Sequence, residues 1–257
     1  MVLDAVRRVE ERGALEMATR VLDAVGMVFR YGCGIGMAQT DVTQGLRQFL
    51  RERPPVQHFP HVSKEDLPHL LKSIEQYHGR PETRLAIQLM MRTFPRTNEL
   101  RWAEWSEFNF DEALWLIPGS RMKGRLVQKE IAPEHIIPLS TQSLEILKRL
   151  HDHTGKFKFL FPNVHNPRNS VMSGDTINKA LKVMGFDGLQ TGHGFRWLAS
   201  TIMNEESNIR PDAIERQLAH RDRNTVRRAY NHAQYLAERI KLMQWWSDYL
   251  DEQRKQP

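Results

Sequence analysis

Several features that define common protein classes are scarce in this sequence. It has one cysteine, Cys33, which excludes an intramolecular disulfide framework and fits a reducing compartment. No apolar run is long enough to span a membrane. The N-terminal segment MVLDAVRRVEERG is charged and amphipathic, unlike a signal peptide. We therefore expect a cytoplasmic protein without a membrane partner.

Motifs for nucleotide and metal chemistry are also missing. The sequence has no Walker loop, no HExxH motif and no carboxylate cluster. His151 and His153 lie two residues apart, which on a helix places them on different faces and argues against a metal site. The GCGIG cluster at residues 32–36 follows no strand, so it indicates a helix cap and turn rather than a phosphate loop. We expect no cofactor and no metal.

The composition is that of an ordinary globular protein. The chain has 257 residues, of which 40% are hydrophobic and 26% charged, enough for a sizeable core. The net charge of +6 and the pI near 9.5 permit a polyanionic partner but do not establish one.

The densest group of chemically capable residues lies in the stretch 191–235. It contains His193 and Arg196 in HGFR, His220 in QLAHRD and Tyr230 in RRAYNH. Alone, each residue type is more often a packing residue than a catalyst. Together, two histidines and an arginine can donate to anionic oxygens, and a phenol becomes a usable nucleophile where nearby cations lower the cost of its ionisation. The set predicts a site for a phosphodiester.

This stretch resembles the C-terminal catalytic block of the tyrosine recombinases, in particular the prophage and genomic-island integrases. That family has an HxxR pair, a second His about two dozen residues later, and a nucleophilic Tyr about ten residues after that; here the two intervals are 24 and 10 residues. Upstream, TFPRTNELRW supplies the family's other arginine as Arg96, with Glu99 as an acidic neighbour that would orient it. RMKGR supplies the lysine of the family's hairpin as Lys123.

The hairpin lysine has a rival. The chain between Lys123 and the strand expected at 135–139 is longer than the usual family hairpin, which makes Lys129 a second candidate for the same role. The match of RMK to the family favours Lys123.

Two further positions depart from the family's pattern. Phe94 and Pro95 stand where many members have a glycine before the first arginine, and Trp197 follows Arg196 where many have a histidine. Neither change removes a reacting group.

The resemblance also implies a division into domains. The three prolines of RERPPVQHFPHVS indicate an extended linker. Residues 1–52 are expected to be the C-terminal part of a helical core-binding domain, residues 53–63 the linker, and residues 64–257 the catalytic domain. The earlier helices of the first domain and the arm-binding domain usual in this branch are not in the sequence, so we expect a fragment of a longer recombinase.

Hydrophobic periodicity and capping residues predict a mostly α fold (α+β), in which a helical catalytic domain contains a small antiparallel sheet. Helices are expected at 2–12, 14–30, 41–51, from Ser63 or Asp66 onward, and at 81–93, 141–152, 173–184 and 234–250; strands are expected at 106–109, 114–118 and 134–139. The last helix has an apolar stripe made of Leu236, Ile240, Met243, Trp246 and Leu250. The stripe either closes its own core or docks on a neighbouring protomer.

The function that the resemblance implies is site-specific DNA recombination. Tyr230 would attack a phosphodiester and form a 3′-phosphotyrosyl link, while Arg96 and Arg196 hold the non-bridging oxygens and Lys123 protonates the leaving 5′-oxygen. His193 and His220 would donate to the phosphate or manage the tyrosine proton. The partners would be double-stranded attachment sites and further copies of the chain, as a tetramer of the full-length protein on DNA.

Two other functions are alternatives, the first of which uses the same reaction. A relaxase of supercoils, similar to type IB topoisomerases, would cut and reseal DNA without strand exchange. A DNA-binding remnant would regulate or block recombination without cutting.

Overall fold

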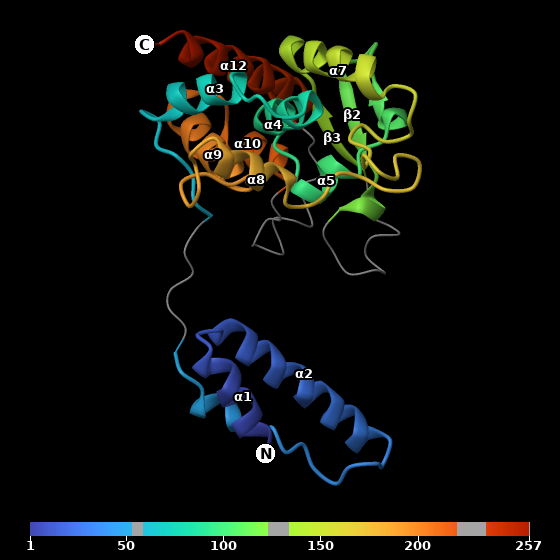
Figure 1. The fold of residues 1–257 in the computed structure, drawn as a ribbon, viewed down its shortest axis with the longest axis vertical. Coiled ribbons are helices and arrows are strands. Elements are labelled where there is room, and N and C mark those ends of the chain that lie inside the picture. Colours follow the sequence, from blue (N-terminus) through green and yellow to red (C-terminus); the bar gives the residue numbers. More distant parts are fainter. Residues whose placement is uncertain (53–58, 123–133, 220–234, 257) are drawn as a thin grey trace. The chain divides into compact units, whose positions relative to one another are not determined.

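The computed structural model describes residues 1–52, 59–122, 134–219 and 235–256, and Figure 1 shows its fold. The chain forms two compact units, Met1–Gln57 and His58–Pro257. Their boundary falls within the range 53–63 expected for the linker. None of the helices in these described ranges is long and apolar enough to cross a membrane.

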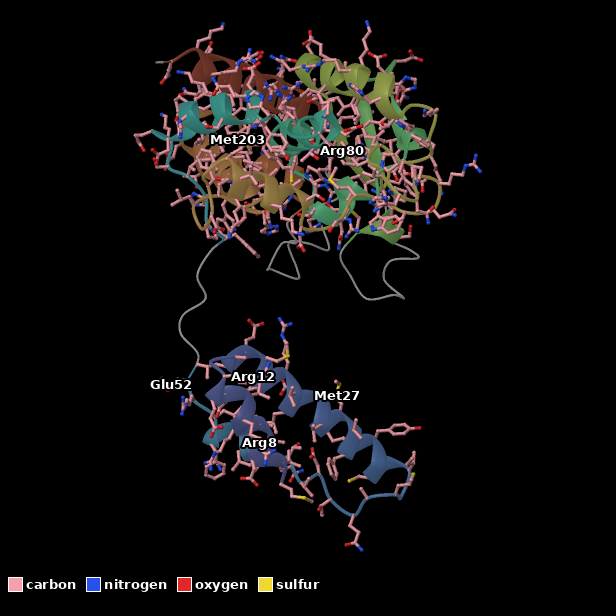
Figure 2. The ribbon with its side chains drawn as sticks, viewed as in Figure 1. Arg8, Arg12, Met27, Glu52, Arg80 and Met203 are labelled. Carbon is pink, nitrogen blue, oxygen red and sulfur yellow. The ribbon has the colours of Figure 1, made fainter. Side chains whose placement is uncertain are left out.

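The first unit is a pair of helices, α1 (Val2–Glu11) and α2 (Leu15–Gly34), that pack against each other around Val6, Ala18 and Leu22. Helix α2 passes Gly32 and ends two residues later; the left-handed glycine that follows it is Gly36, with φ 75°. The GCGIG cluster is therefore a helix end and turn, as its sequence indicates. Met27 of α2 is labelled in Figure 2, and 62% of it is exposed.

The helix expected at 41–51 is reduced to one 3₁₀ turn, η1 (Leu46–Phe49). The carboxylate of Asp41 accepts hydrogen bonds from the backbone N (2.9 Å) and hydroxyl (2.5 Å) of Thr43, and Gly45 is left-handed with φ 73°. A short acid that binds the backbone two residues ahead competes with the helix. Local turn chemistry therefore overrode the apolar spacing.

The second unit is mostly helical with a small sheet, which confirms the expected fold class. Its α-helices are α3 (Leu67–Glu75), α4 (Pro81–Thr93), α5 (Thr97–Arg101), α7 (Thr141–Thr154), α8 (Thr176–Val183), α9 (Gly194–Glu206), α10 (Pro211–Gln217) and α12 (Leu236–Lys255). Two short 3₁₀ helices, η2 (Trp105–Glu107) and η3 (Gly119–Arg121), flank the first two strands. The strands β1 (Phe108–Asn109), β2 (Leu114–Ile117) and β3 (His135–Pro138) form an antiparallel sheet in the order β1-β2-β3.

Helix α4 lies at the centre of this unit, with contacts to α3, α7, α8, α9 and α12 (Figure 1). From Leu85 to Met91, all but one of its side chains are at most 2% exposed. A helix that is apolar on nearly every side belongs inside a domain. The expected bounds 81–93 are those of the structure, because Pro81 starts the helix and Pro95 prevents its continuation.

The C-terminal helix α12 packs on its own domain, against α3, α4, α7, α10 and β3. Its inner face is rotated from the expected stripe: Ile240 is 49% exposed, whereas Arg239 is fully buried. Residues Leu242, Met243 and Trp246 complete the buried face, and the Trp246 indole donates to the Met91 carbonyl at 2.8 Å. The expected stripe was therefore wrong at Ile240, because a charged residue occupies the inward position beside it.

This rotation can be tested with two substitutions on one helix. We expect Met243→Ala to lower the free energy of unfolding by about 2–5 kcal/mol, since it opens a cavity in the core. Ile240→Ala is the matched control and should change it by less than about 0.5 kcal/mol. All six tryptophans belong to the second unit, so tryptophan fluorescence in a urea titration reports its unfolding. Equal losses for the two variants would contradict the observed packing.

Candidate active site

Arg96 lies just after the end of the central helix α4. Helix α4 stops at Phe94, which adopts the left-handed conformation with φ 57°, and Arg96 two residues later is the N-cap of α5. Glycine adopts that conformation most easily, whereas other residues adopt it at a cost of about 1–2 kcal/mol. The Phe94 ring is 1% exposed and lies 5.7 Å from the Trp246 ring. Burial of the Phe94 ring therefore offsets the backbone strain of a left-handed residue that is not glycine.

Glu99 holds Arg96 in place. The Glu99 carboxylate accepts a hydrogen bond from the Arg96 backbone N at 2.7 Å and another from Arg96 Nη1 at 2.6 Å. Glu99 is only 3% exposed, while the Arg96 side chain is 23% exposed. A buried carboxylate of this kind both orients the guanidinium and balances its charge. The structure thus brings these two sequence-predicted residues into direct contact.

Arg196 lies in the first turn of α9 and reaches across the domain to two backbone carbonyls. Its Nη1 donates to the Phe94 carbonyl and its Nη2 to the Leu218 carbonyl, at the ends of α4 and α10. The last carbonyls of a helix have no intrahelical donor, so they are ready acceptors for a cation. Burial, together with the nearby Arg96 charge, lowers the Arg196 pKa to about 10, which leaves the guanidinium protonated at neutral pH.

The two arginines meet at one short piece of chain. Arg96 Nη2 lies 3.4 Å from the Ala219 carbonyl, and Arg196 binds the carbonyl of the preceding residue, Leu218. Arg96 and Arg196 are a hundred positions apart in the sequence, yet they donate to consecutive backbone carbonyls. This piece of chain comes directly before His220. The structure therefore pairs the two guanidinium groups at the residues that precede His220 in the sequence.

His193 is the N-cap of α9, three residues before Arg196. Its ring contacts the Phe59 ring edge-to-face, with 4.3 Å between centroids. The Pro60 carbonyl accepts from the Thr191 backbone N at 3.1 Å, and a Cβ added to Gly194 would meet that carbonyl oxygen at 2.2 Å. Only glycine permits this close approach. The last residues of the expected linker thus pack along the loop that carries His193.

Four of the predicted site residues lie outside the described part of the chain: Lys123, Lys129, His220 and Tyr230. Trp197, the second departure from the family's pattern, is 39% exposed on α9. Among the residues that are described, no three His, Cys, Asp or Glu side chains gather into a group that could hold a metal ion.

Sequence reasoning missed Arg121, which fastens the chain just before Lys123. Its Nη2 donates to the Glu99 carbonyl at 2.8 Å, and its Nη1 binds the Trp102 carbonyl and lies 3.0 Å from the Glu107 carboxylate. The segment RMK resembles the family's pattern through its lysine, whereas the arginine two positions earlier joins this segment to α5.

Sequence reasoning also missed His135, the first residue of β3. It is buried, and its pKa is lowered to about 3 by burial and by the charges of Arg239, Arg216 and Arg196. His135 is therefore a neutral imidazole among cations. The alternation of strand residues was the available signal, since it places His135 on the same face as the buried Ile137.

Comparison with known proteins gives consistent matches over nearly the whole chain. The model described as "Phage integrase family" matches residues 61–236, and "Phage integrase central domain" matches residues 1–49. The integrase of Enterobacteria phage P4 is 37% identical over 261 aligned positions, covering 98% of this chain and 59% of that protein. The putative protein IntB of Escherichia coli K12 is also 37% identical, covering 99% of this chain and 66% of that protein.

Among solved structures, a lambda integrase tetramer bound to a Holliday junction matches with a TM-score of 0.62 at 15% identity. The match covers 87% of this chain and 64% of that one. At this identity the likeness concerns the fold. The chain spans 59% and 66% of the lengths of the two curated relatives.

The buried imidazole predicts an acid-sensitive fold. Folded His135 binds a proton only near pH 3, whereas the unfolded chain binds it near 6.5, so between these values the unfolded state holds the extra proton. The free energy of unfolding should therefore fall as the pH is lowered from 6.5 towards 3. His135→Gln should remove about 2 kcal/mol of the loss measured between pH 7.5 and pH 5. Urea titrations at both pH values check this.

The exposed His165 provides the control for this measurement. His165→Gln should keep the pH dependence of the wild-type protein. If His135→Gln also keeps it, His135 is not the group that makes the fold sensitive to acid.

Proposed function

This chain belongs to the phage integrase family of tyrosine recombinases, and from that premise we propose that it recombines DNA at specific sites. It cuts one strand through a 3′-phosphotyrosyl intermediate and then rejoins it to a partner strand. The chain covers only part of its curated relatives, so the activity is proposed for the protein of which these residues form the core-binding and catalytic parts.

The observation that carries the proposal is the convergence of Arg96 and Arg196. Two N–H groups of Arg196 hold backbone carbonyls and thereby fix the plane of its guanidinium, and Glu99 does the same for Arg96. A guanidinium has five N–H donors in one plane, and its geometry matches two oxygens of a phosphate. Donors that are already oriented lose little entropy when charge develops on a phosphodiester. This pair supports phosphoryl transfer more than DNA binding alone.

The proposed step balances without an outside source of energy. The Tyr230 oxygen forms a bond to phosphorus while the bond from phosphorus to the 5′-oxygen breaks. Arg96 and Arg196 hold the non-bridging oxygens, and Lys123 gives a proton to the leaving 5′-oxygen. His193 and His220 donate to the phosphate or take the tyrosine proton. The ester to Tyr230 keeps the bond energy, so a 5′-hydroxyl reverses the step without ATP.

The domains and partners follow from this function. We assign residues 1–52 to core binding, 53–63 to the linker and 64–257 to catalysis. The protein would act on double-stranded attachment sites in the cytoplasm. Four copies of the full-length protein are expected on DNA, and a lambda integrase tetramer bound to a Holliday junction is among the similar structures. Helix α12 packs in its own domain here. Its exchange between protomers belongs to the assembled complex and is proposed only there.

The test is covalent trapping of the protein on nicked DNA. A randomised library of nicked duplexes is incubated with the protein, SDS-resistant adducts are recovered, and their sequences identify the cleaved site. Wild-type protein should form adducts and Tyr230→Phe should form none, because only the nucleophilic oxygen is lost. Binding to the same duplexes should be nearly unchanged, since phosphate contacts supply most of the affinity.

Tyr235→Phe is the matched control and should form adducts as the wild-type protein does. Adducts from Tyr230→Phe would contradict the assignment and make Tyr235 the next candidate. Binding by wild-type protein without any adduct would favour a DNA-binding remnant. Relaxation of supercoiled DNA that lacks partner sites would favour a topoisomerase-like enzyme.

A second prediction separates Lys123 from Lys129 as the general acid. An alkoxide leaves poorly without a proton, whereas a thiolate leaves readily. Sulfur in place of the bridging 5′-oxygen should therefore restore cleavage by Lys123→Ala but not by Arg96→Ala, because Arg96 stabilises the non-bridging oxygens. Rates of adduct formation on the two substrates measure the rescue.

The same substrate pair decides the alternatives. Rescue of Lys129→Ala in place of Lys123→Ala would assign the acid to Lys129. If neither variant is rescued, the proton comes from another group, and His220 is tested next.

A further inference from the structure

Arg239 is a buried arginine to which the proposed reaction gives no role. It lies in the first turns of α12, and its side chain is fully buried. Its Nε donates to the Gln217 side-chain oxygen at 2.9 Å, and its Nη2 donates to the Ile136 carbonyl. Gln217 is the last residue of α10, and Ile136 lies in β3. One guanidinium therefore joins α10, β3 and α12.

Burying this side chain is costly. Moving an arginine out of water is unfavourable, and an apolar residue of similar size could close the same core. Burial and the nearby Arg216 charge lower the Arg239 pKa to about 10, so the side chain stays charged at neutral pH. A methionine or leucine would fill the space but would have no donors in a fixed plane. The property that only arginine supplies here is its directional hydrogen bonding.

In the sequence, the residues that Arg239 joins flank the stretch with His220 and Tyr230 and follow the stretch with Lys123 and Lys129. Gln217 precedes His220 by three residues, and Arg239 follows Tyr230 by nine. The bond between them therefore ties the two ends of the chain that holds the proposed nucleophile. Ile136 lies in the strand that follows Lys123 and Lys129. The same side chain thus joins α10 and α12, which precede and follow Tyr230 in the sequence, to β3, which follows Lys123 and Lys129.

The charge of Arg239 acts on a group that Arg196 also affects. Buried His135 feels the charges of Arg239, Arg216 and Arg196 together. The charges of all three arginines therefore reach the first residue of β3. Gln217, which accepts from Arg239, directly precedes Leu218, whose carbonyl binds Arg196.

We propose that Arg239 is a positioning residue for strand cleavage, which brings Tyr230 and the hairpin lysine to the same phosphate by fastening Gln217 and β3 to α12. The inference rests on the proposed function, because it requires Tyr230 as the nucleophile. Arg239 contacts neither the DNA nor the reacting atoms in this role. Its removal should lower the rate of cleavage while leaving the affinity for DNA in place.

The experiment compares Arg239→Met with wild-type protein on the nicked duplex recovered from the library. Met fills much of the space but donates no hydrogen bond. We expect single-turnover adduct formation at saturating DNA to fall about 10²-fold, the loss typical of a small displacement of reacting groups. The Kd for DNA, measured by fluorescence anisotropy, should stay within about threefold of the wild-type value, because phosphate contacts dominate affinity. A loss of affinity with an unchanged rate would overturn the proposal.

Arg92→Met provides the matched control. Arg92 is another buried arginine that fastens α12, through an ion pair of 2.7 Å with Asp251. It should lower stability in a urea titration without a comparable fall in the cleavage rate. An equal fall in rate for Arg92→Met would reduce Arg239 to a general support of α12.

Arg239→Lys keeps the inference testable if Arg239→Met does not fold. Lysine keeps the charge but cannot reproduce the fork, so its rate should lie between those of wild-type protein and Arg239→Met. A rate within threefold of wild-type protein for either folded variant would overturn the inference, while wild-type adducts that depend on Tyr230 would still uphold the proposed function. The absence of any wild-type adduct would overturn both.

Discussion

The candidate site depends on two arginines being held close together in the folded protein. Like charges repel, and both guanidinium groups are partly or fully removed from water, so their arrangement requires compensation. The Glu99 carboxylate and the consecutive carbonyls of Leu218 and Ala219 supply it. These acceptors belong to helix ends, where carbonyls lack intrahelical partners. The positions of α4, α5, α9 and α10 therefore determine whether the site exists at all.

The central helix connects the core to the site. Because α4 is buried on nearly all sides, its end is held firmly, and the left-handed Phe94 turns the chain so that its carbonyl meets Arg196 while Arg96 starts the next helix. Phe94 contacts Trp246 of α12. The packing of the C-terminal helix and the geometry of the arginine pair are thus parts of one arrangement, although the helix carries none of the matched catalytic residues.

Local signals predicted the elements whose ends have clear physical causes. Pro81 and Pro95 bound α4 as expected, and Ser140 caps α7 by accepting from the Ser143 backbone N at 3.2 Å. The predictions failed where a contact between neighbours decided the outcome. Asp41 turned the expected helix at 41–51 into a single 3₁₀ turn. The stripe on α12 failed at Ile240, because hydrophobicity alone does not reveal that a charged neighbour faces inward.

By itself, the sequence determined the helical class, the family and the identity of the candidate residues, because spacing along the chain preserves the order of a catalytic block. Tertiary structure alone decided which groups meet: the carbonyls that receive Arg96 and Arg196, the packing of Phe59 on His193, the neutral His135 and the hydrogen bonds of Arg239 to Gln217 and Ile136. The physical reason is that most of these contacts join residues more than a hundred positions apart in the sequence. They depend on burial and on the directions of backbone carbonyls and side chains, and none of these properties can be read from the order of residues.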